Sequence, residues 1–592
     1  MTLAETLADT FARPLSPVGR WIGRRLWWVE HAFERARASE RALDDARLRI
    51  FFVLVLFGAG YLTLSLGATR AALFSRYGRG EALVDSEPNA RADLLDRNGQ
   101  VLALDVPRFG LYLDPRQILF KRQVRDALVA ALPGLDAAKL DRALADGRRE
   151  YLMGGLTTAE ERKVHDLGLP GVSFEDETGR DYPLGSLGAH VIGFSSDDGR
   201  GLAGAEKAFD AAIRAWAGKA PVTLAIDLRV QGALEDELDK ASAAMKVADA
   251  AGIVVDVRTG EILGLASYPS FDANHAGEAN PAAMVDHAAA TVYEPGSVMK
   301  VFTLAMGIDA GVATPRTLFD VSHPLQVDGQ TIHDYDSGDK TLTLAQVFTH
   351  SSNIGAAKLG LMAGAPTMSR YFHAFGLFDA APSELVESAR PLTARALTPN
   401  IVASMSFGHS ISVTPLAIAT GMSAIFDGGV YRPLTLKKLE PGQAPAAGRR
   451  VIKPSTSRTM LDLMRLNVVD GTGSKADALG LRVGGKTGTA TKLVNGHYDE
   501  GRNALNLASF AAVFPTDGAL SANRYLVLIM LDEPKPDAAD DGVTTGAFTA
   551  APIARRVIDR IAPFVGVRRI VVASDLAPKS HAKAEALGAH EQ

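Results

Sequence analysis

An apolar run near the N-terminus is the first feature in the pattern of hydrophobic and polar positions. Residues 50–69 (IFFVLVLFGAGYLTLSLGAT) carry no charged side chain and are about long enough to cross a bilayer as a helix. Because the run follows a long polar extension, we interpret it as a retained transmembrane anchor rather than a cleaved signal peptide. Arginines are more numerous just before the run than just after it, which predicts a cytoplasmic N-terminus and an exported C-terminal part.

Beyond this run, the pattern up to residue 220 predicts a mixed α/β domain. Asn98-Gly99 between two apolar runs is typical of a hairpin. Apolar and charged residues alternate at helical spacing over residues 114–162, which predicts small helices, and turn and strand residues return at 179–193. His190 has no partner motif nearby, so we interpret it as a structural residue rather than a catalytic base.

A second domain follows, and its pattern predicts one antiparallel sheet covered by helices. Two apolar strands come early around a turn at Arg258-Thr259-Gly260, three come late, and helical patterns broken by Gly and Pro fill the residues between. We expect strand 483–490 to form the edge of the sheet beside the active site. The expected strands are 252–257, 261–266, 483–490, 507–514 and 525–531, with a helix before them at 230–245 and one after them at 553–561.

These patterns divide the α/β (α+β) chain into five segments, as expected for a length of 592 residues, which is too long for one core. We predict a cytoplasmic segment (1–49), a transmembrane helix (50–69), a mixed α/β domain (70–220), a five-stranded sheet domain with helices (221–565) and a C-terminal tail (566–592).

Composition removes several classes of function. The net charge is −5, whereas a nucleic-acid-binding protein normally has a surplus of basic residues. Cysteine is absent, which excludes disulfides and thiolate metal sites. No feature of the chain calls for a metal or an organic cofactor.

Three short motifs carry the chemistry: Ser297-x-x-Lys300, Ser351-x-Asn353 and Lys486-Thr487-Gly488. Together they resemble the motif set of β-lactamases and penicillin-binding proteins. A Ser one helical turn before a Lys places hydroxyl and amine on one face, within reach for proton transfer. Each motif alone is weak, because Ser337–Lys340, Ser580–Lys583 and Ser521–Asn523 also fit the patterns. Only Ser297 follows a Pro-Gly turn and opens an apolar helical run.

The expected roles follow from the chemistry of acyl transfer. Ser297 is the candidate nucleophile and Lys300 the base, if its amine is neutral. Ser351 and Asn353 are expected to relay the proton and to hold Lys300, while Lys486 supplies positive charge. Backbone N–H groups of Ser297 and Thr489 are plausible oxyanion donors. We expect Thr487, Gly488 and Thr489 to bind the substrate, with the hydroxyl groups of the two threonines donating hydrogen bonds to its carboxylate.

The residues around these motifs resemble the transpeptidase domain of class B penicillin-binding proteins. The resemblance rests on residues 293–300 (YEPGSVMK), 350–355 (HSSNIG) and 485–490 (GKTGTA). It extends to that class's N-terminal pedestal domain, of the penicillin-binding protein dimerisation type, through residues 91–103, 180–183 (RDYP) and 201–206 (GLAGAE). Residues 406–416 (SFGHSISVTPL) are more similar to the division branch, the FtsI type, than to the elongation branch. Asp286-His287-Ala288 departs from the Asn-Arg-Ala expected there.

The resemblance implies a peptidoglycan D,D-transpeptidase that cross-links stem peptides in septal wall synthesis and is acylated by β-lactams at Ser297. It also implies a single-pass protein of the bacterial inner membrane with a periplasmic catalytic domain. An FtsW-type glycan polymerase and other division proteins would be its partners.

Three other interpretations share some of these features. An elongation-type transpeptidase would use the same chemistry. A β-lactamase or β-lactam sensor shares the three motifs but leaves the long N-terminal domain and the anchor unexplained. A non-catalytic division scaffold conflicts with the intact motif residues, since loss of one group would be enough to abolish acylation.

Overall fold

The computed structural model describes residues 31, 53–65, 90–335, 340–494, 497–498, 505–535 and 543–572. The chain forms two compact units, Met1–Val84 and Asp85–Gln592. In the first, residues 53–65 are helical and their apolar side chains are exposed. Within the described ranges, no helix is both long and apolar enough to cross a membrane. Residues 50–52 and 66–69 of the predicted anchor lie outside the described residues.

The second unit begins with the predicted hairpin. β1 (Leu94–Leu95) pairs with β2 (Val101–Leu113), and Gly99 turns between them with φ +84°. The Asp96 carboxylate accepts hydrogen bonds from the backbone N–H groups of Asn98 and Gln100, which fixes this turn.

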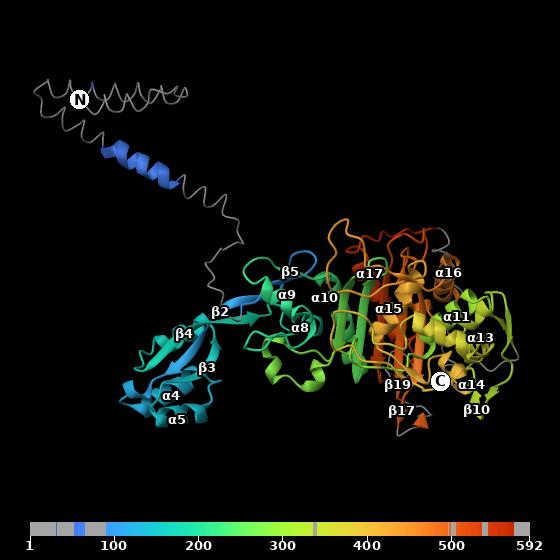
Figure 1. The fold of residues 1–592 in the computed structure, drawn as a ribbon, viewed down its shortest axis with the longest axis horizontal. Helices are drawn as coiled ribbons and strands as arrows, with labels where there is room; N and C mark the ends of the chain where they lie inside the picture. Colours follow the sequence, from blue (N-terminus) through green and yellow to red (C-terminus); the bar gives the residue numbers. More distant parts are fainter. Residues whose placement is uncertain are drawn as a thin grey trace, which may run out of the picture. The chain divides into compact units, whose positions relative to one another are not determined.

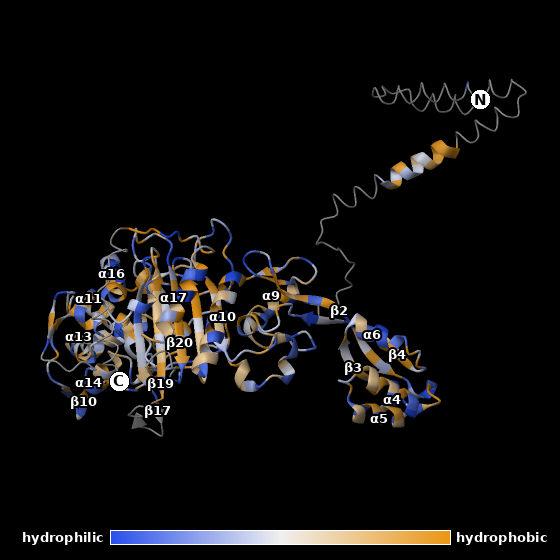
Figure 2. Cartoon of the chain, turned by 180° about the vertical axis from the view of Figure 1, so that it is seen from behind, coloured by the Kyte–Doolittle hydropathy of each residue, from blue (hydrophilic) through white to orange (hydrophobic). Residues whose placement is uncertain are grey.

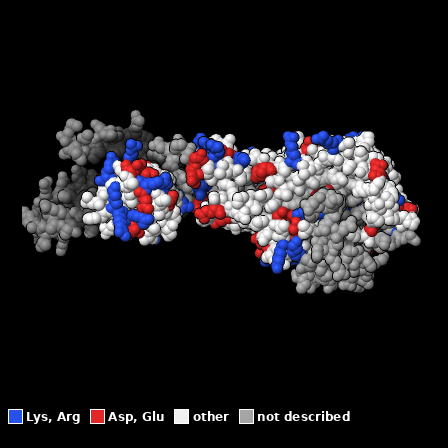
Figure 3. Space-filling model, turned by 90° about the horizontal axis from the view of Figure 1, so that it is seen from below, with Lys and Arg blue, Asp and Glu red and all other residues white. Residues whose placement is uncertain are grey.

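β2 also organises a separate lobe. It pairs with β3 (Glu150–Leu156) and β4 (Val172–Asp181), while α4 (Lys121–Ala131), α5 (Ala137–Asp146) and α6 (Thr158–His165) pack against this sheet (Figure 1). Residues 114–162 were predicted to form helices only, and this is wrong for β3. Its Gly154-Gly155 pair weakens any local strand pattern, and pairing with β2 creates the strand. On the face seen in Figure 3, basic and acidic side chains of this lobe are interspersed. The lobe also contains the Arg125–Asp141 ion pair.

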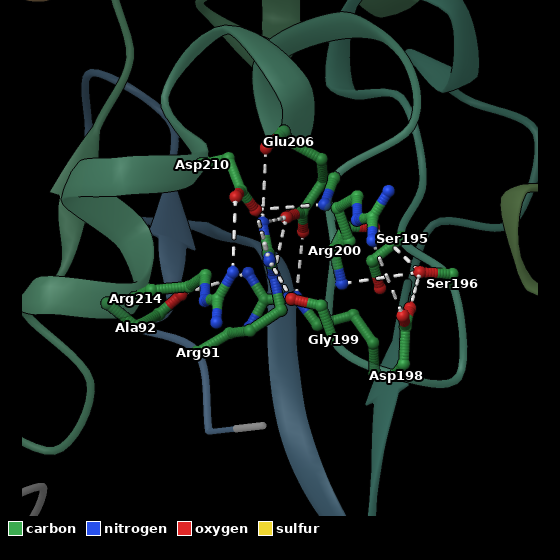
Figure 4. Close-up of polar contacts among 12 residues, drawn as sticks. Arg91, Ala92, Ser195, Ser196, Asp198, Gly199, Arg200, Glu206, Asp210 and Arg214 are labelled. Atoms are coloured by element: carbon green, nitrogen blue, oxygen red, sulfur yellow. Dashed lines mark hydrogen bonds and ion pairs between the residues drawn. The ribbon is translucent and has the colours of Figure 1, made fainter. Parts of the chain in front are cut away.

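A buried ion-pair network joins the start of this unit to the segment that follows β4 (Figure 4). The Arg91 guanidinium donates to Glu206 from Nε at 2.9 Å and to Asp210 from Nη1 at 2.6 Å. Arg180 donates to the other oxygen of Glu206 at 2.7 Å and to Asp105 at 2.9 Å. The side chain of Glu206 is fully buried, so its charge is balanced by two cations rather than by water.

His190 lies nearby and is buried. Its Nε2 is 2.9 Å from the carbonyl oxygen of Ala283, and its ring packs edge-on against Phe271. Burial lowers the pKa of His190 to about 4, so the imidazole is neutral at physiological pH. These contacts agree with the structural role expected for it.

The second domain contains the predicted five-stranded antiparallel sheet, which is confirmed. Its strand order is β16 (Gly484–Thr491), β19 (Asn506–Phe514), β20 (Tyr525–Asp532), β6 (Asp249–Asp256) and β7 (Ile262–Tyr268), with β16 at one edge. The strands β6, β19 and β20 are almost wholly buried and mostly hydrophobic (Figure 2), because helices cover both faces of the sheet. α10 (Leu228–Met245) and α17 (Ala550–Ile561) share one core with the sheet, and α11 (Lys300–Asp309), α15 (Pro415–Phe426) and α16 (Pro454–Asp470) share the other.

The remaining elements of the described part of the chain are, apart from the 22-residue α13, short. The helices are η1 (Pro115–Gln117), α7 (Ala189–Ile192), α8 (Gly204–Ala208), α9 (Asp210–Ala215), η2 (Ala273–Glu278), η3 (Pro281–Met284), η4 (Gly296–Met299), α12 (Leu344–Thr349), α13 (Asn353–Ala374), α14 (Pro399–Met405) and η5 (Ser474–Ala476). The strands are β5 (Val222–Thr223), β8 (Leu318–Asp320), β9 (Leu325–Val327), β10 (Gln330–Ile332), β11 (Thr341–Thr343), β12 (Leu392–Thr393), β13 (Ile411–Ser412), β14 (Val430–Tyr431), β15 (Arg449–Arg450), β17 (Leu493–Val494) and β18 (His497–Tyr498).

Candidate active site

The three motifs come from distant parts of the sequence and meet around one amine, that of Lys300. Ser297 lies in η4 and Lys300 is the first residue of α11, so the side chains share one side of a continuous helical turn. Lys300 Nζ is 2.9 Å from Ser297 Oγ, 3.2 Å from Ser351 Oγ and 2.7 Å from Asn353 Oδ1, and it also contacts the Ser351 carbonyl.

The third motif reaches the same centre from the sheet edge. Lys486 on β16 donates from Nζ to Ser351 Oγ at 2.9 Å, so the Ser351 hydroxyl lies between two lysines. Both lysines are fully buried, while Ser297 and Ser351 are half-buried. One hydrogen-bonded network therefore connects the side chains of Ser297, Lys300, Ser351, Asn353 and Lys486.

Close backbone contacts bring the nucleophile turn against the sheet. Gly296 has φ +55°, and a Cβ added there would lie 2.7 Å from the carbonyl oxygen of Thr489. A Cβ on Gly488 would lie 2.2 Å from Ser509 Oγ and 2.8 Å from the carbonyl oxygen of Pro295. Gly488 thus has a packing reason to be glycine, and its predicted part in substrate binding stays a prediction.

The two threonines of β16 have polar neighbours already in place. Thr487 Oγ1 is 2.8 Å from Thr472 Oγ1, and Thr489 Oγ1 accepts a 3.2 Å hydrogen bond from the backbone N–H of Gly546. Asn467 donates to the carbonyl oxygen of Gly485 at 2.8 Å and so supports the strand from behind. Sequence reasoning missed Thr472, which has no motif of its own.

Asp334 is a second residue that sequence reasoning missed. One carboxylate oxygen accepts from the backbone N–H groups of Asn353 at 2.6 Å and Ile354 at 2.9 Å, and the other accepts from Ser352 Oγ at 2.5 Å. This carboxylate caps the N-terminus of α13 and holds the loop in which Ser351 adopts φ +60°. It lies 18 residues before Ser352, too far for a local capping pattern to identify it.

The competing motif matches are not at this centre or lie outside the described residues. Ser521 is in the connection between β19 and β20, where its carbonyl accepts from Arg258. Ser337 and Ser580 are outside the described residues. Among the described residues, no group of three His, Cys, Asp or Glu side chains is arranged to hold a metal ion.

The chain is similar in sequence to known proteins along most of its length. Residues 250–559 match the penicillin binding protein transpeptidase domain, and residues 86–241 match the penicillin-binding protein dimerisation domain. The chain is 50% identical to a probable peptidoglycan D,D-transpeptidase FtsI of Caulobacter vibrioides, over 94% of this chain and 95% of that protein. It is 29% identical to the peptidoglycan D,D-transpeptidase FtsI of Escherichia coli K12, over 79% of this chain and 83% of that protein.

A solved structure shows the same fold. Penicillin binding protein 3 from Mycobacterium tuberculosis, complexed with aztreonam, superimposes with a TM-score of 0.63 at 23% sequence identity. The match covers 82% of this chain and 98% of that one.

Proposed function

The chain belongs to the class B penicillin-binding proteins of the FtsI type, and from this premise we propose that it cross-links peptidoglycan stem peptides through an acyl-enzyme at Ser297. The reaction is a serine D,D-transpeptidation in septal cell-wall synthesis, and β-lactams acylate the same serine. The observation that carries the assignment of residues is the 2.9 Å contact between Lys300 Nζ and Ser297 Oγ, in a network that continues to Ser351 and Lys486.

Acylation begins with proton transfer from Ser297. Its Oγ gives the proton to Lys300 Nζ and forms a bond to the penultimate D-Ala carbonyl carbon of the donor stem peptide. Two buried lysines around one hydroxyl disfavour two simultaneous ammonium charges, which supports a neutral Lys300 as the base. Backbone N–H groups of Ser297 and Thr489 stabilise the oxyanion.

Breakdown of the tetrahedral intermediate formed by this attack releases the terminal D-Ala. The C–N bond breaks, and the leaving amine takes the proton from Lys300 through the Ser351 hydroxyl, which is 3.2 Å from Lys300 Nζ. Lys486, Thr487 and Thr489 hold the terminal carboxylate of the donor. The amine of a neighbouring stem then forms a C–N bond to the ester carbonyl carbon, the C–O bond to Ser297 breaks, and the proton that the amine loses returns to Ser297 Oγ.

The cellular setting is part of the same proposal. Residues 50–69 would anchor the protein in the inner membrane, with residues 1–49 in the cytoplasm and the rest in the periplasm. Residues 70–220 would serve as a pedestal for the transpeptidase domain (221–565), followed by a tail (566–592). An FtsW-type glycan polymerase and other division proteins would be the partners.

A labelling experiment with fluorescent penicillin tests the proposal. The full-length chain in detergent should form a stable covalent adduct that Ser297→Ala abolishes. Ser521→Ala is the matched control, because Ser521-x-Asn523 fits one of the motifs but lies outside the site, and it should label like the wild type. An adduct that decays within seconds would instead indicate a β-lactam hydrolase, and absence of wild-type labelling would favour a non-catalytic scaffold.

A further inference from the structure

The segment that leads to the nucleophile is paired with a segment more than a hundred residues later. Tyr293 and Val413 exchange both backbone hydrogen bonds, with N···O distances of 3.0 and 2.9 Å. Further along, Gly296 N donates to the carbonyl oxygen of Gly408 at 3.3 Å. Residues 293–296 and 408–413 therefore run side by side immediately before Ser297.

The Glu294 carboxylate bridges these two segments. One oxygen accepts from the backbone N–H of Ser410 at 2.8 Å, and the other lies 3.0 Å from His409 Nδ1. The side chains of Glu294 and His409 are 15% and 21% exposed, so the pair is partly shielded from water and from salt. Hydrogen bonds to a carboxylate are about twice as strong as those between neutral groups.

The bridged turn has a backbone shape that needs such support. Ser410 has φ +60° and Gly408 has φ +95°, and only the glycine adopts positive φ without cost. The His409 ring also packs edge-on against Phe407, with ring centroids 5.3 Å apart. The carboxylate and the aromatic contact together hold the imidazole in one orientation.

This turn presses on the backbone that carries the nucleophile. A Cβ on Gly408 would lie 2.0 Å from the carbonyl oxygen of Gly296, and a Cβ on Gly296 would lie 2.7 Å from that of Thr489. Three backbones are therefore stacked in contact: the 408–410 turn, the Pro295-Gly296 turn and strand β16. The spacing between the backbone N–H groups of Ser297 and Thr489 depends on the middle layer staying in place.

We propose that Glu294 and His409 are positioning residues for the oxyanion site, an inference that rests on the proposed function of Ser297. Their bridge clamps the 408–410 turn onto Gly296 and so fixes the Ser297 N–H relative to the Thr489 N–H. Both act on the reaction through this backbone geometry. Their loss slows bond formation to the acylating agent more than it weakens the initial binding of that agent.

The test separates binding from acylation in the full-length chain in detergent. Stopped-flow labelling with a fluorescent penicillin gives the dissociation constant before acylation and the acylation rate constant at saturation. His409→Phe keeps a ring beside Phe407 but removes the donor to Glu294, and the acylation rate constant should fall about tenfold while the dissociation constant stays within about twofold. The loss is smaller than the roughly 100-fold that follows removal of an oxyanion donor, because the donor is displaced and not deleted.

Conservative variants and a matched control distinguish positioning from general stability. His409→Asn places an N–H close to the position of Nδ1 and should restore most of the rate. His275→Phe disrupts a different contact between a histidine and a carboxylate in the same domain, the exposed 3.2 Å contact with Asp272, and should leave the rate constant unchanged.

Several results would overturn the inference. Wild-type acylation rates in His409→Phe would do so, as would a loss in this variant that His409→Asn fails to restore. If His409→Phe does not fold, Glu294→Gln gives the same test, because it keeps an acceptor for the Ser410 N–H and removes the charge opposite His409. An unchanged acylation rate constant in Glu294→Gln would likewise refute the positioning role of the Glu294–His409 pair. If the wild-type chain is not labelled by penicillin, both the proposed function and the positioning role are overturned. If the wild type is labelled and the variants acylate at the same rate, only the positioning role is refuted.

Discussion

Replacement of Glu206 by Gln should strongly destabilise the domain that precedes the transpeptidase domain. The Glu206 carboxylate is fully buried and accepts from both Arg91 and Arg180, whose side chains are 1% and 6% exposed. Glutamine removes the negative charge, and its amide oxygen can accept from only one of the two buried guanidinium groups while its NH2 group faces the other. Removal of one partner from a buried ion pair typically costs 3–5 kcal/mol. Because Asp105 and Asp210 still pair with the two arginines, we expect the lower end, about 3 kcal/mol.

Calorimetric unfolding of the full-length chain measures this effect. For a unit of roughly 150 residues, a loss of about 3 kcal/mol lowers the melting temperature by about 6 to 12 °C. Asp141→Asn is the control: it breaks the Arg125–Asp141 pair, whose side chains are 35% and 51% exposed, and should leave the melting temperature close to that of the wild type. If Glu206→Gln melts no lower than Asp141→Asn, the argument that this buried network holds the domain together is wrong.

Two further predictions concern the nucleophile turn and the dependence of stability on pH. Gly296→Ala places a methyl group 2.7 Å from the Thr489 carbonyl oxygen and should lower the rate of penicillin acylation about 100-fold. Gly277→Ala, which has open space around its Cβ, is the control and should acylate like the wild type. Equal acylation rates in the two variants would contradict the argument from close backbone approach. Burial raises the pKa of Glu235, which accepts from Gly188 N, to about 7 from 4.5, so its contribution to stability is complete below about pH 4.5 and is lost as the pH rises through 7. Between pH 5 and pH 8, the wild type should therefore lose up to about 3 kcal/mol of unfolding free energy in urea titrations that Glu235→Gln retains, and parallel pH profiles would refute this assignment.

Much of the transpeptidase domain was predictable because its strands are buried on both faces. Uninterrupted apolar runs such as Leu507–Phe514 and Tyr525–Leu531 can hardly be solvent-exposed, and their order along the chain matches the observed sheet. The three motifs were also recognisable, since a Ser and a Lys one turn apart need only a local helix to come together.

The missed features all depend on contacts between distant loops. Asp334 caps α13 from 18 residues away, and Glu294 meets His409 across 115 residues, so neither pair has a local spacing that identifies it. Thr472 is adjacent to Thr487 only because α16 packs behind β16. The strand β3 was missed for a related reason, because pairing with β2 overrides a weak local preference.

The placement of β1 has a mechanical consequence. This short strand lies between β2 and β5 and runs parallel to β5; Leu224 donates to its Leu95 carbonyl, and Val222 donates to the carbonyl of Asp93 just before it. Residues just after β5 are bonded in turn to Leu436 of the transpeptidase domain. Tension on the chain ahead of Arg91 would therefore be carried by the bonds of Arg91 and Ala92 and, in shear, by the two bonds from Val222 and Leu224, which connect it to the catalytic domain. The Arg91 N–H also bonds Asp105 of β2, so part of the same load reaches the sheet that carries the lobe of α4, α5 and α6.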